Sequence, residues 1–285
     1  MLQQANSRGR AMILADGHVH FHACYDVARF LDAAADNFAA HDSAADAGVP
    51  RRWMLWLTEA READFFDRLR EGVALGRNTA GGQWTFEATP EDGAIRCRDG
   101  GGRIITLAAG RQIVTGEGVE VLALGTTERI RDGMPIGETL SRVCEAGALS
   151  VLPWGFGKWL GRRGSIITRQ LGRAEPGELF LGDNSGRPAL APPPRQFTQA
   201  QAAGIRILPG SDPLPFPEEC RNVASYGFRL DAADLRPDLV GQAKELLRQP
   251  GARVTPFGRR NTAWDVARNQ IALRLARRTR TAAAS

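Results

Sequence analysis

Hydrophobic and polar positions follow two periods in the first 75 residues. Residues 12–21 form an apolar run that ends in histidines, which predicts a buried strand, and residues 26–44 carry apolar side chains at helical spacing. The same succession follows in a short bulky run at 52–57, predicted as a second strand, and in a helical pattern at 62–75. The chain therefore begins with two strand–helix units.

The period changes between residues 76 and 126. Glycines separate short alternating runs there, and residues 99–102 and 116–118 carry strong turn signals. Short alternating runs joined by tight turns are typical of antiparallel hairpins. The predicted strands are residues 84–88, 94–98, 103–107, 112–114 and 119–124.

Helices and strands alternate again from residue 136. The predicted helices are residues 136–146, 157–171 and 198–203. The predicted strands are residues 148–152, 178–181 and 205–208. Such alternation predicts parallel β-α units, arranged as a doubly wound sheet or a barrel. The chain ends in a predicted helix at about 262–278.

Length and apolar runs limit the class of protein. A chain of 285 residues suffices for one large α/β domain. No apolar run approaches the roughly 20 residues that a membrane span needs, and no signal peptide is recognisable, so we expect a cytoplasmic location without membrane contact. We expect a disordered N-terminus at residues 1–10, a barrel domain at 11–250 and a basic C-terminal helix and tail at 251–285.

Positive charge is concentrated at the C-terminus. The net charge is +5, but residues 251–285 hold eight arginines against a single acid, Asp265. The rest of the chain is therefore slightly acidic, and the basic character belongs to the tail. A basic helix of this kind could touch nucleic acid, but an exposed tail helix is the commoner explanation and the one we favour.

Three of the four histidines lie in the run DGHVHFH at residues 16–22. Residues i and i+2 of a strand point the same way, so His18, His20 and His22 can share one face. Two imidazoles on one face can bind a single metal ion, and imidazole suits zinc, iron or manganese. The competing explanation is that one or two of these histidines are hydrogen-bonded structural residues at the end of a strand.

A carboxylate follows the late strand at 205–208. Asp212 lies in the tripeptide Gly-Ser-Asp at residues 210–212, at a position where α/β barrels place catalytic groups. The tripeptide alone is a weak signal, because an aspartate in a turn more often caps a helix.

The order of these motifs resembles the PHP (polymerase and histidinol phosphatase) domain, a distorted α/β barrel of metal-dependent phosphoesterases. The run DGHVHFH is similar to the family's D-x-H-x-H, and the residues at 210–214, GSDPL, are similar to its G-S-D-A-H. Weaker similarities lie between them, over about residues 12–230. They are LTEA at 57–60, GRQI at 110–113, GVEVLAL at 118–124, LPWG at 152–155 and GDNS at 182–185. The resemblance implies a PHP-like (β/α)7-type barrel, here with an antiparallel β-hairpin insertion.

The chain departs from the family pattern at several ligand positions. The family's histidine or glutamate ligands are replaced by other residues, which are Ala60, Gln112, Glu120, Trp154 and Leu214. The resemblance leaves His18, His20 and Asp212 as metal ligands, with Glu59 as a further ligand or a base. Glu59 and Asp212 are then the candidate catalytic residues. This set holds ligands for one metal ion, or at most two.

Phosphate recognition usually takes an arginine or a lysine at the mouth of the site. Lys158 and Arg187 follow predicted strands at the presumed open face, although a solvated surface charge is the commoner role for such residues. Asn184 and Trp154 complete the candidate substrate-binding set. For Trp154, packing in the core is the competing explanation.

Three functions are compatible with these residues. We favour a metal-dependent hydrolase of the PHP type that acts on a small phosphorylated substrate, with a divalent zinc, manganese or iron ion. The alternative is a PHP-derived pseudoenzyme that binds a ligand or protein partner, with or without a metal. An amidohydrolase-like hydrolase comes third, because that group also pairs a first-strand His-x-His with a last-strand aspartate. The sequence does not identify the substrate or the oligomeric state.

Overall fold

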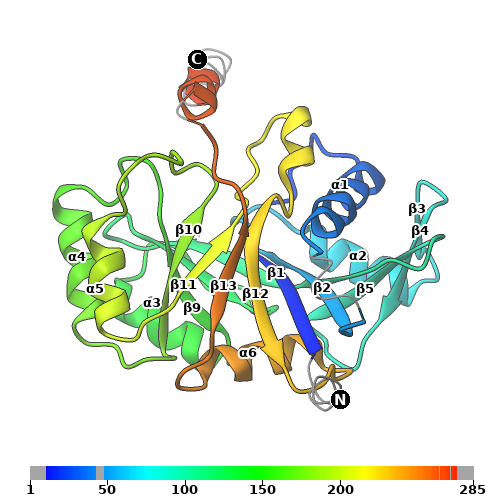
Figure 1. Ribbon diagram of the computed structural model, residues 1–285, viewed down its shortest axis with the longest axis horizontal. Helices are drawn as coiled ribbons and strands as arrows, with labels where there is room; N and C mark the ends of the chain where they lie inside the picture. The colour runs from blue at the N-terminus through cyan, green and yellow to red at the C-terminus, as the bar shows by residue number, and fades with distance from the viewer. Residues whose placement is uncertain (1–10, 43–47, 263, 270, 275–285) are drawn as a thin grey trace, which may run out of the picture.

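A computed structural model describes residues 11–42, 48–262, 264–269 and 271–274, and it has a mixed α/β architecture with two β-sheets (Figure 1). The strands are β1 (Ala11–Val19), β2 (Arg51–Leu57), β3 (Thr79–Ala80), β4 (Trp84–Ala88), β5 (Ala94–Asp99), β6 (Ile104–Ala108), β7 (Gly110–Val114), β8 (Glu120–Leu124), β9 (Leu149–Pro153), β10 (Leu179–Asn184), β11 (Ile207–Gly210), β12 (Tyr226–Ala232) and β13 (Val254–Gly258). The helices are α1 (Val27–Ala40), α2 (Phe65–Ala74), α3 (Ile136–Glu145), α4 (Gly161–Leu171), α5 (Arg195–Ala202), the 3-10 helix η2 (Pro217–Asn222) and α6 (Leu239–Arg248).

The larger sheet has the strand order β13-β12-β1-β2-β6-β5-β4-β3, and the smaller has the order β11-β10-β9-β8-β7. β1 and β2 pair in parallel, as do β9, β10 and β11, so the ends of these strands lie at one edge of each sheet. The predicted hairpin region is confirmed in β3 to β6, which pair antiparallel and extend the larger sheet.

The two sheets approach each other at two seams without a continuous ladder. At one seam, the Glu59 N–H donates to the Gly110 carbonyl at 3.1 Å, and the Gln112 N–H donates to the Glu59 carbonyl at 2.9 Å. At the other, the Asp212 N–H donates to the His18 carbonyl at 2.8 Å. Among the described residues the strand order does not close into a ring, so the α/β class is confirmed, but the closed (β/α)7-type barrel is not.

Glycines allow the close approach of β1 and β11. A Cβ atom on Gly210 would lie 2.4 Å from the His18 nitrogen, and one on Gly17 would lie 2.8 Å from the Pro209 carbonyl oxygen. Both distances are shorter than a van der Waals contact, so a side chain at either position would force the strands apart. The absence of these side chains lets the end of β1 meet the loop after β11.

Three apolar clusters fill the molecule. One packs α1 and α2 against the larger sheet, one lies between the sheets and α6, and one packs α3, α4 and α5 against the smaller sheet (Figure 1). Helix α1 is typical: the Asp26 side chain caps it by accepting from the Arg29 N–H at 2.9 Å, and Phe30, Leu31 and Phe38 face the core. These clusters hold the strands whose ends carry the candidate site.

The C-terminal third contains elements that the sequence analysis did not predict. β12 pairs antiparallel with β1, and β13 pairs antiparallel with β12, so the sheet continues past residue 250 into the segment assigned to the tail. Residues 264–269 and 271–274 are helical, as expected for the predicted helix at 262–278, whose last residues lie outside the described part. The predicted disordered residues 1–10 also lie outside it.

In the part of the chain that the structure describes, none of the helices has the length and apolar content to cross a bilayer.

Candidate metal centre

Asp16 anchors the end of β1. Its buried carboxylate accepts hydrogen bonds from the backbone N–H groups of His18 at 3.1 Å, Ser211 at 2.8 Å and Ala224 at 2.9 Å, and from the Ser211 hydroxyl. Burial raises the pKa of Asp16 to about 7, and the hydrogen bonds from Ser211 act in the opposite direction. This carboxylate therefore ties the histidine strand to the loop after β11.

Three potential ligand atoms converge beyond this anchor. The Nε2 atoms of His18 and His20 lie 3.1 Å apart, and each lies 3.6 Å from Oδ1 of Asp212. Around a tetrahedral ion with bonds of about 2.1 Å, neighbouring ligand atoms are separated by roughly 3.4 Å. The triangle of donor atoms therefore matches one face of such a coordination shell, and two nitrogens with one carboxylate oxygen suit zinc and related divalent ions.

The protonation states also fit a metal ligand set. Burial, reinforced by His18, lowers the pKa of His20 to about 3, so this imidazole is neutral near pH 7 and offers a lone pair. Burial alone would raise the pKa of Asp212, but His18, His20 and Lys158 outweigh it and lower that pKa. Asp212 is therefore an anion beside two imidazole nitrogens.

Asn184, at the end of β10, orients Asp212. Its Nδ2 donates to Oδ2 of Asp212 at 2.7 Å and to the Trp154 carbonyl at 2.9 Å, which leaves Oδ1 of Asp212 facing the histidines. Asp212 has a φ of 48°, in the left-handed region that aspartate and asparagine tolerate better than most residues. Such a carboxamide behind a ligand fixes the direction of its lone pairs.

His22, the third histidine of the run, points elsewhere. Its Nε2 lies 3.0 Å from the Pro213 carbonyl oxygen, and it is not part of the ligand group found among the described residues. His22 therefore holds the loop that carries Asp212.

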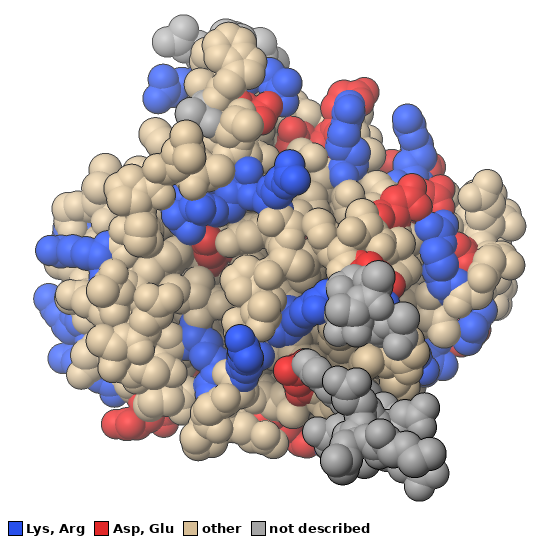
Figure 2. Space-filling view, in the orientation of Figure 1, with Lys and Arg blue, Asp and Glu red and all other residues tan. Residues whose placement is uncertain are grey.

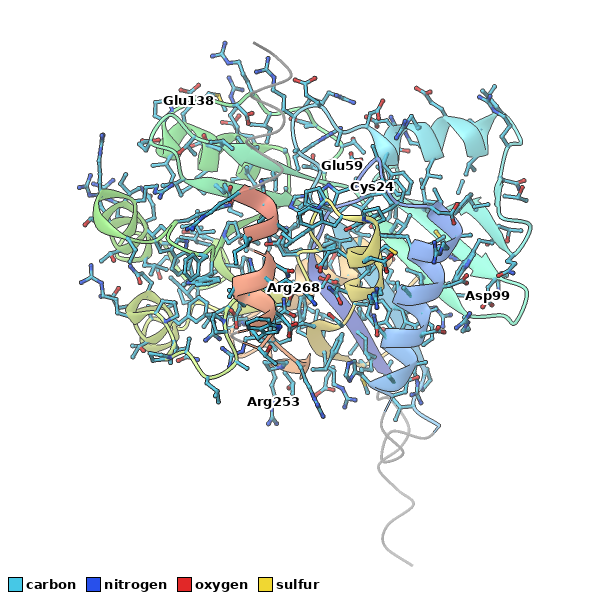
Figure 3. The ribbon with its side chains drawn as sticks, turned by 90° about the horizontal axis from the view of Figure 1, so that it is seen from above. Cys24, Glu59, Asp99, Glu138, Arg253 and Arg268 are labelled. Atoms are coloured by element: carbon cyan, nitrogen blue, oxygen red, sulfur yellow. The ribbon has the colours of Figure 1, made fainter. Side chains whose placement is uncertain are left out.

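Glu59 is also outside this ligand group. Its Oε1 accepts from the Phe66 N–H at 3.0 Å at the start of α2, and its Oε2 lies 3.2 Å from Nη1 of Arg111. Arg111 in turn pairs with Asp67 at 3.2 Å. Burial raises the pKa of Glu59. Both oxygens are thus used within the protein, and a role for Glu59 as ligand or base stays a prediction. Figure 3 labels Glu59 in the view from above.

Arg187 belongs to a buried ion pair. Its guanidinium donates to both oxygens of Asp183, from Nε at 2.7 Å and from Nη2 at 2.6 Å, and the Tyr226 hydroxyl donates to the same carboxylate at 2.9 Å. Arg187 and Trp154 line a groove of about 510 Å³. Arg187 is therefore held by Asp183, and phosphate binding by either groove residue stays a prediction.

Lys158 is placed differently from Arg187. Its ammonium lies on the loop after β9 and donates to Oε1 of Glu120 at 2.5 Å. The contact between Lys158 and Glu120, and the place of Asp16 and Ser211 in the site, were not predicted from the sequence. The acidic first residue of the run DGHVHFH was the available signal for Asp16.

No protein-family model matches the sequence, and no curated protein does. The structure is similar to the crystal structure of PsfC from Pseudomonas syringae PB-5123, with a TM-score of 0.54 and 15% identity over 95% of this chain and 99% of that one. It is similar to the lesion-specific endonuclease PfuEndoQ from Pyrococcus furiosus, with a TM-score of 0.51 and 10% identity over 85% of this chain. The chain spans only 57% of that endonuclease.

A third similar structure is a two-domain protein from Bacteroides vulgatus that contains a predicted PHP-like metal-dependent phosphoesterase. Its TM-score is 0.47 at 14% identity, over 88% of this chain and 66% of that one. The similarity to the endonuclease, with a TM-score of 0.51, supports a PHP-like fold. At 10–15% identity, the similarity concerns the fold and not the activity.

Proposed function

We propose that this PHP-like protein is a metal-dependent hydrolase that acts on a phosphate ester with a single divalent metal ion. The observation that carries the proposal is the convergence of His18 Nε2, His20 Nε2 and Asp212 Oδ1 within 3.1–3.6 Å of one another. When bound, a divalent ion would lower the pKa of a bound water and polarise a phosphoryl oxygen. Three protein ligands leave positions open for water and substrate.

The surrounding residues prepare this group. Asp16 fixes the backbone of His18 and Ser211, so the ligands from β1 and from the loop after β11 keep their spacing. Asn184 sets the rotation of the Asp212 carboxylate. We propose that the two sheets form the wall of a distorted barrel around this end, in a domain that begins at residue 11 and extends past residue 250 to include β13.

A small phosphorylated substrate is favoured over nucleic acid. On the face shown in Figure 2, lysine and arginine side chains lie in several separate groups among acidic and uncharged residues, instead of forming one continuous basic surface. A backbone-tracking nucleic-acid interface needs a continuous run of positive charge. A compact phosphate ester needs positive charge only beside the metal.

A binding protein without catalysis is the second candidate. It is favoured by the pairing of two further acids that could have held a second ion, since Glu59 is engaged by Arg111 and Glu120 by Lys158. Mechanisms that place one ion on the attacking oxygen and another on the leaving oxygen need both ions.

The first experiment is metal analysis of the purified protein by plasma mass spectrometry, before and after incubation with zinc, manganese and iron. We expect about one ion per chain, lost in the His18→Ala/His20→Ala variant. His41→Ala is the matched control, because His41 is the one histidine outside the run at residues 16–22. Absence of metal from the wild-type protein after all three incubations would refute the proposal.

Turnover is the second measurement. We expect the metal-loaded protein to hydrolyse p-nitrophenyl phosphate, or another ester in a panel of phosphate monoesters, and the double histidine variant to be inactive. A stoichiometric metal ion without turnover of any ester would favour the binding protein.

A further inference from the structure

Lys158, on the loop after β9, forms an ion pair with Glu120, the first residue of β8. The ammonium donates to Oε1 of Glu120 at 2.5 Å, and the two residues are 38 positions apart in the sequence. The Lys158 side chain remains 46% exposed, whereas Glu120 is only 16% exposed. The pair thus presents its ammonium to solvent and keeps its carboxylate partly covered.

The backbone directs Lys158 toward Glu120. The Lys158 N–H donates to the Gly155 carbonyl at 2.9 Å, which closes a turn directly after β9. A Cβ atom on Gly155 would lie 2.5 Å from Cδ of Lys158 and 3.0 Å from its Cγ, so the lysine stem runs across the glycine. A side chain at position 155 would displace the stem, and the glycine therefore determines where the ammonium lies.

The loop that carries Lys158 is tied to the ligand group by Asn184. Its Nδ2 donates to the Trp154 carbonyl at 2.9 Å and to Oδ2 of Asp212 at 2.7 Å. The turn from Gly155 to Lys158 follows Trp154 directly, so these two hydrogen bonds hold the lysine loop next to Asp212. A phosphoryl group bound at the ligand group would therefore experience the positive charge of the Lys158 ammonium.

The ammonium has hydrogen-bonding capacity left. An ammonium carries three N–H donors, and the described residues supply one acceptor to Lys158, on Glu120. The other lysine of the chain is different, because Lys244 donates to the carbonyls of Gly125 and Gly147 and is less exposed than Lys158. Of the two lysines, Lys158 has the more exposed ammonium, and the described residues leave two of its N–H donors without a recorded acceptor.

We propose that Lys158 and Glu120 form an anion-binding subsite next to the metal centre. The Lys158 ammonium binds the non-bridging oxygens of the substrate's phosphoryl group and of the phosphate product, and Glu120 is a positioning residue that holds the ammonium in place. This inference rests on the proposed function for its role in turnover, but binding of phosphate to Lys158 does not require a metal ion.

The test uses the two lysines as reporters. Selective ¹³C labelling of lysine at Cε keeps all three N–H donors and gives one NMR signal for each of the two lysines, assigned with Lys158→Arg and Lys244→Arg variants. Inorganic phosphate is titrated into the full-length protein, as purified and after zinc addition, against sodium chloride of matched ionic strength. We expect the Lys158 signal to shift saturably with phosphate and the Lys244 signal to stay in place.

Kinetic measurements on Lys158 and Glu120 variants distinguish lost phosphate binding from misfolding. In Lys158→Met, the inhibition constant for inorganic phosphate and the KM for a phosphate ester should both rise by about tenfold or more. The metal content should be unchanged. Lys158→Arg should recover most of the loss. Glu120→Gln should show a smaller increase of KM at unchanged metal content.

The outcomes distinguish the two proposals. A Lys158 signal that shifts no more in phosphate than in chloride, or unchanged phosphate inhibition in Lys158→Met, would overturn the subsite even if the protein binds metal and turns over esters. A saturable shift in a protein that binds no metal would support the subsite and refute the hydrolase.

Discussion

Two neighbouring strands of the smaller sheet, β10 and β11, each have an aspartate near their C-terminal end, and the two aspartates have opposite surroundings. Asp183, in β10, is 4% exposed and faces the guanidinium of Arg187 and the hydroxyl of Tyr226. Asp212, just after β11, faces His18 and His20 and has a side chain that is 25% exposed. The first carboxylate is neutralised by an arginine, whereas the second accepts from the neutral amide of Asn184 through Oδ2 and turns Oδ1 toward two imidazole nitrogens.

This difference separates a structural acid from a candidate ligand. A buried carboxylate with a bidentate arginine has its charge and its acceptors used within the fold. The Asp212 oxygen and the two imidazole nitrogens lie within 3.6 Å of one another, and none of the three groups is an arginine or a lysine. Only a proton or a metal ion can satisfy that arrangement. Both residues are aspartates near a strand end. The candidate site is identified by which carboxylate has its charge neutralised within the protein and which does not.

The largest effect on stability is expected at Asp183. Asp183→Asn leaves the buried Arg187 guanidinium without its counter-charge, and we expect a loss of about 3–5 kcal/mol of unfolding free energy. Urea denaturation measures it, with Tyr226→Phe as the milder control that removes only one neutral donor. The folded fraction should keep its metal content. A loss below about 1 kcal/mol would show that Asp183 is not the structural acid of the pair.

At Asp212 we expect the opposite result, with metal affinity lost and stability kept. Asp212→Asn keeps the shape of the side chain and tolerates the left-handed backbone, so unfolding free energy should change by less than about 1 kcal/mol. Metal affinity should fall more than about 100-fold, because one of three ligands loses its charge. Competition with a fluorescent zinc chelator measures the affinity. Retained affinity would contradict the assignment of Asp212 as a ligand.

A smaller effect on the metal is expected from Asn184. Asn184→Ala removes the donor to Oδ2 of Asp212 at 2.7 Å, and loss of such an outer partner typically weakens metal binding by about 10–100-fold. Metal content at saturation should stay at one ion per chain, which distinguishes a positioning role from a ligand role. The same competition assay reports it, and unchanged affinity would place Asn184 with the structural residues.

The smallest effect is expected at Glu59. In Glu59→Gln the amide oxygen can still accept from the Phe66 N–H, and Arg111 keeps Asp67, so we expect a loss of about 1–2 kcal/mol in unfolding free energy. Metal affinity should be unchanged within twofold. Loss of metal in this variant would restore Glu59 to the ligand set that the family resemblance implies.

Local pattern was sufficient to predict much of the architecture. The strand through residues 12–21, the helix after it and the hairpins between 76 and 126 all correspond to elements of the structure, because their apolar periods match the faces that they bury. β12 and β13 were not predicted. β12 pairs with β1, about 215 residues earlier in the chain, so its stability depends on a partner that a local window does not contain.

The candidate site was predicted in part for the same reason. His18 and His20 share a face because they are two residues apart in a strand, and the ligand group does contain both. The side chains that contact Glu59, Arg187 and Lys158 could not be predicted from the spacing of residues along the sequence. Glu59 meets Arg111, and Lys158 meets Glu120, only after the strands have come together. Which charged side chains pair with each other is therefore known only from the folded structure.

The position of the ligand group at the seam between β1 and β11 gives a bound ion a structural role. His18 lies in β1 of the larger sheet, His20 directly follows that strand, and Asp212 follows β11 of the smaller sheet. The backbones of Gly17 and Gly210 approach closely there without a continuous ladder. An ion held by all three residues would cross-link two sheets that no continuous backbone ladder joins at this seam. Chelation should therefore speed amide hydrogen exchange at the ends of β1 and β11 before it affects the rest of either sheet.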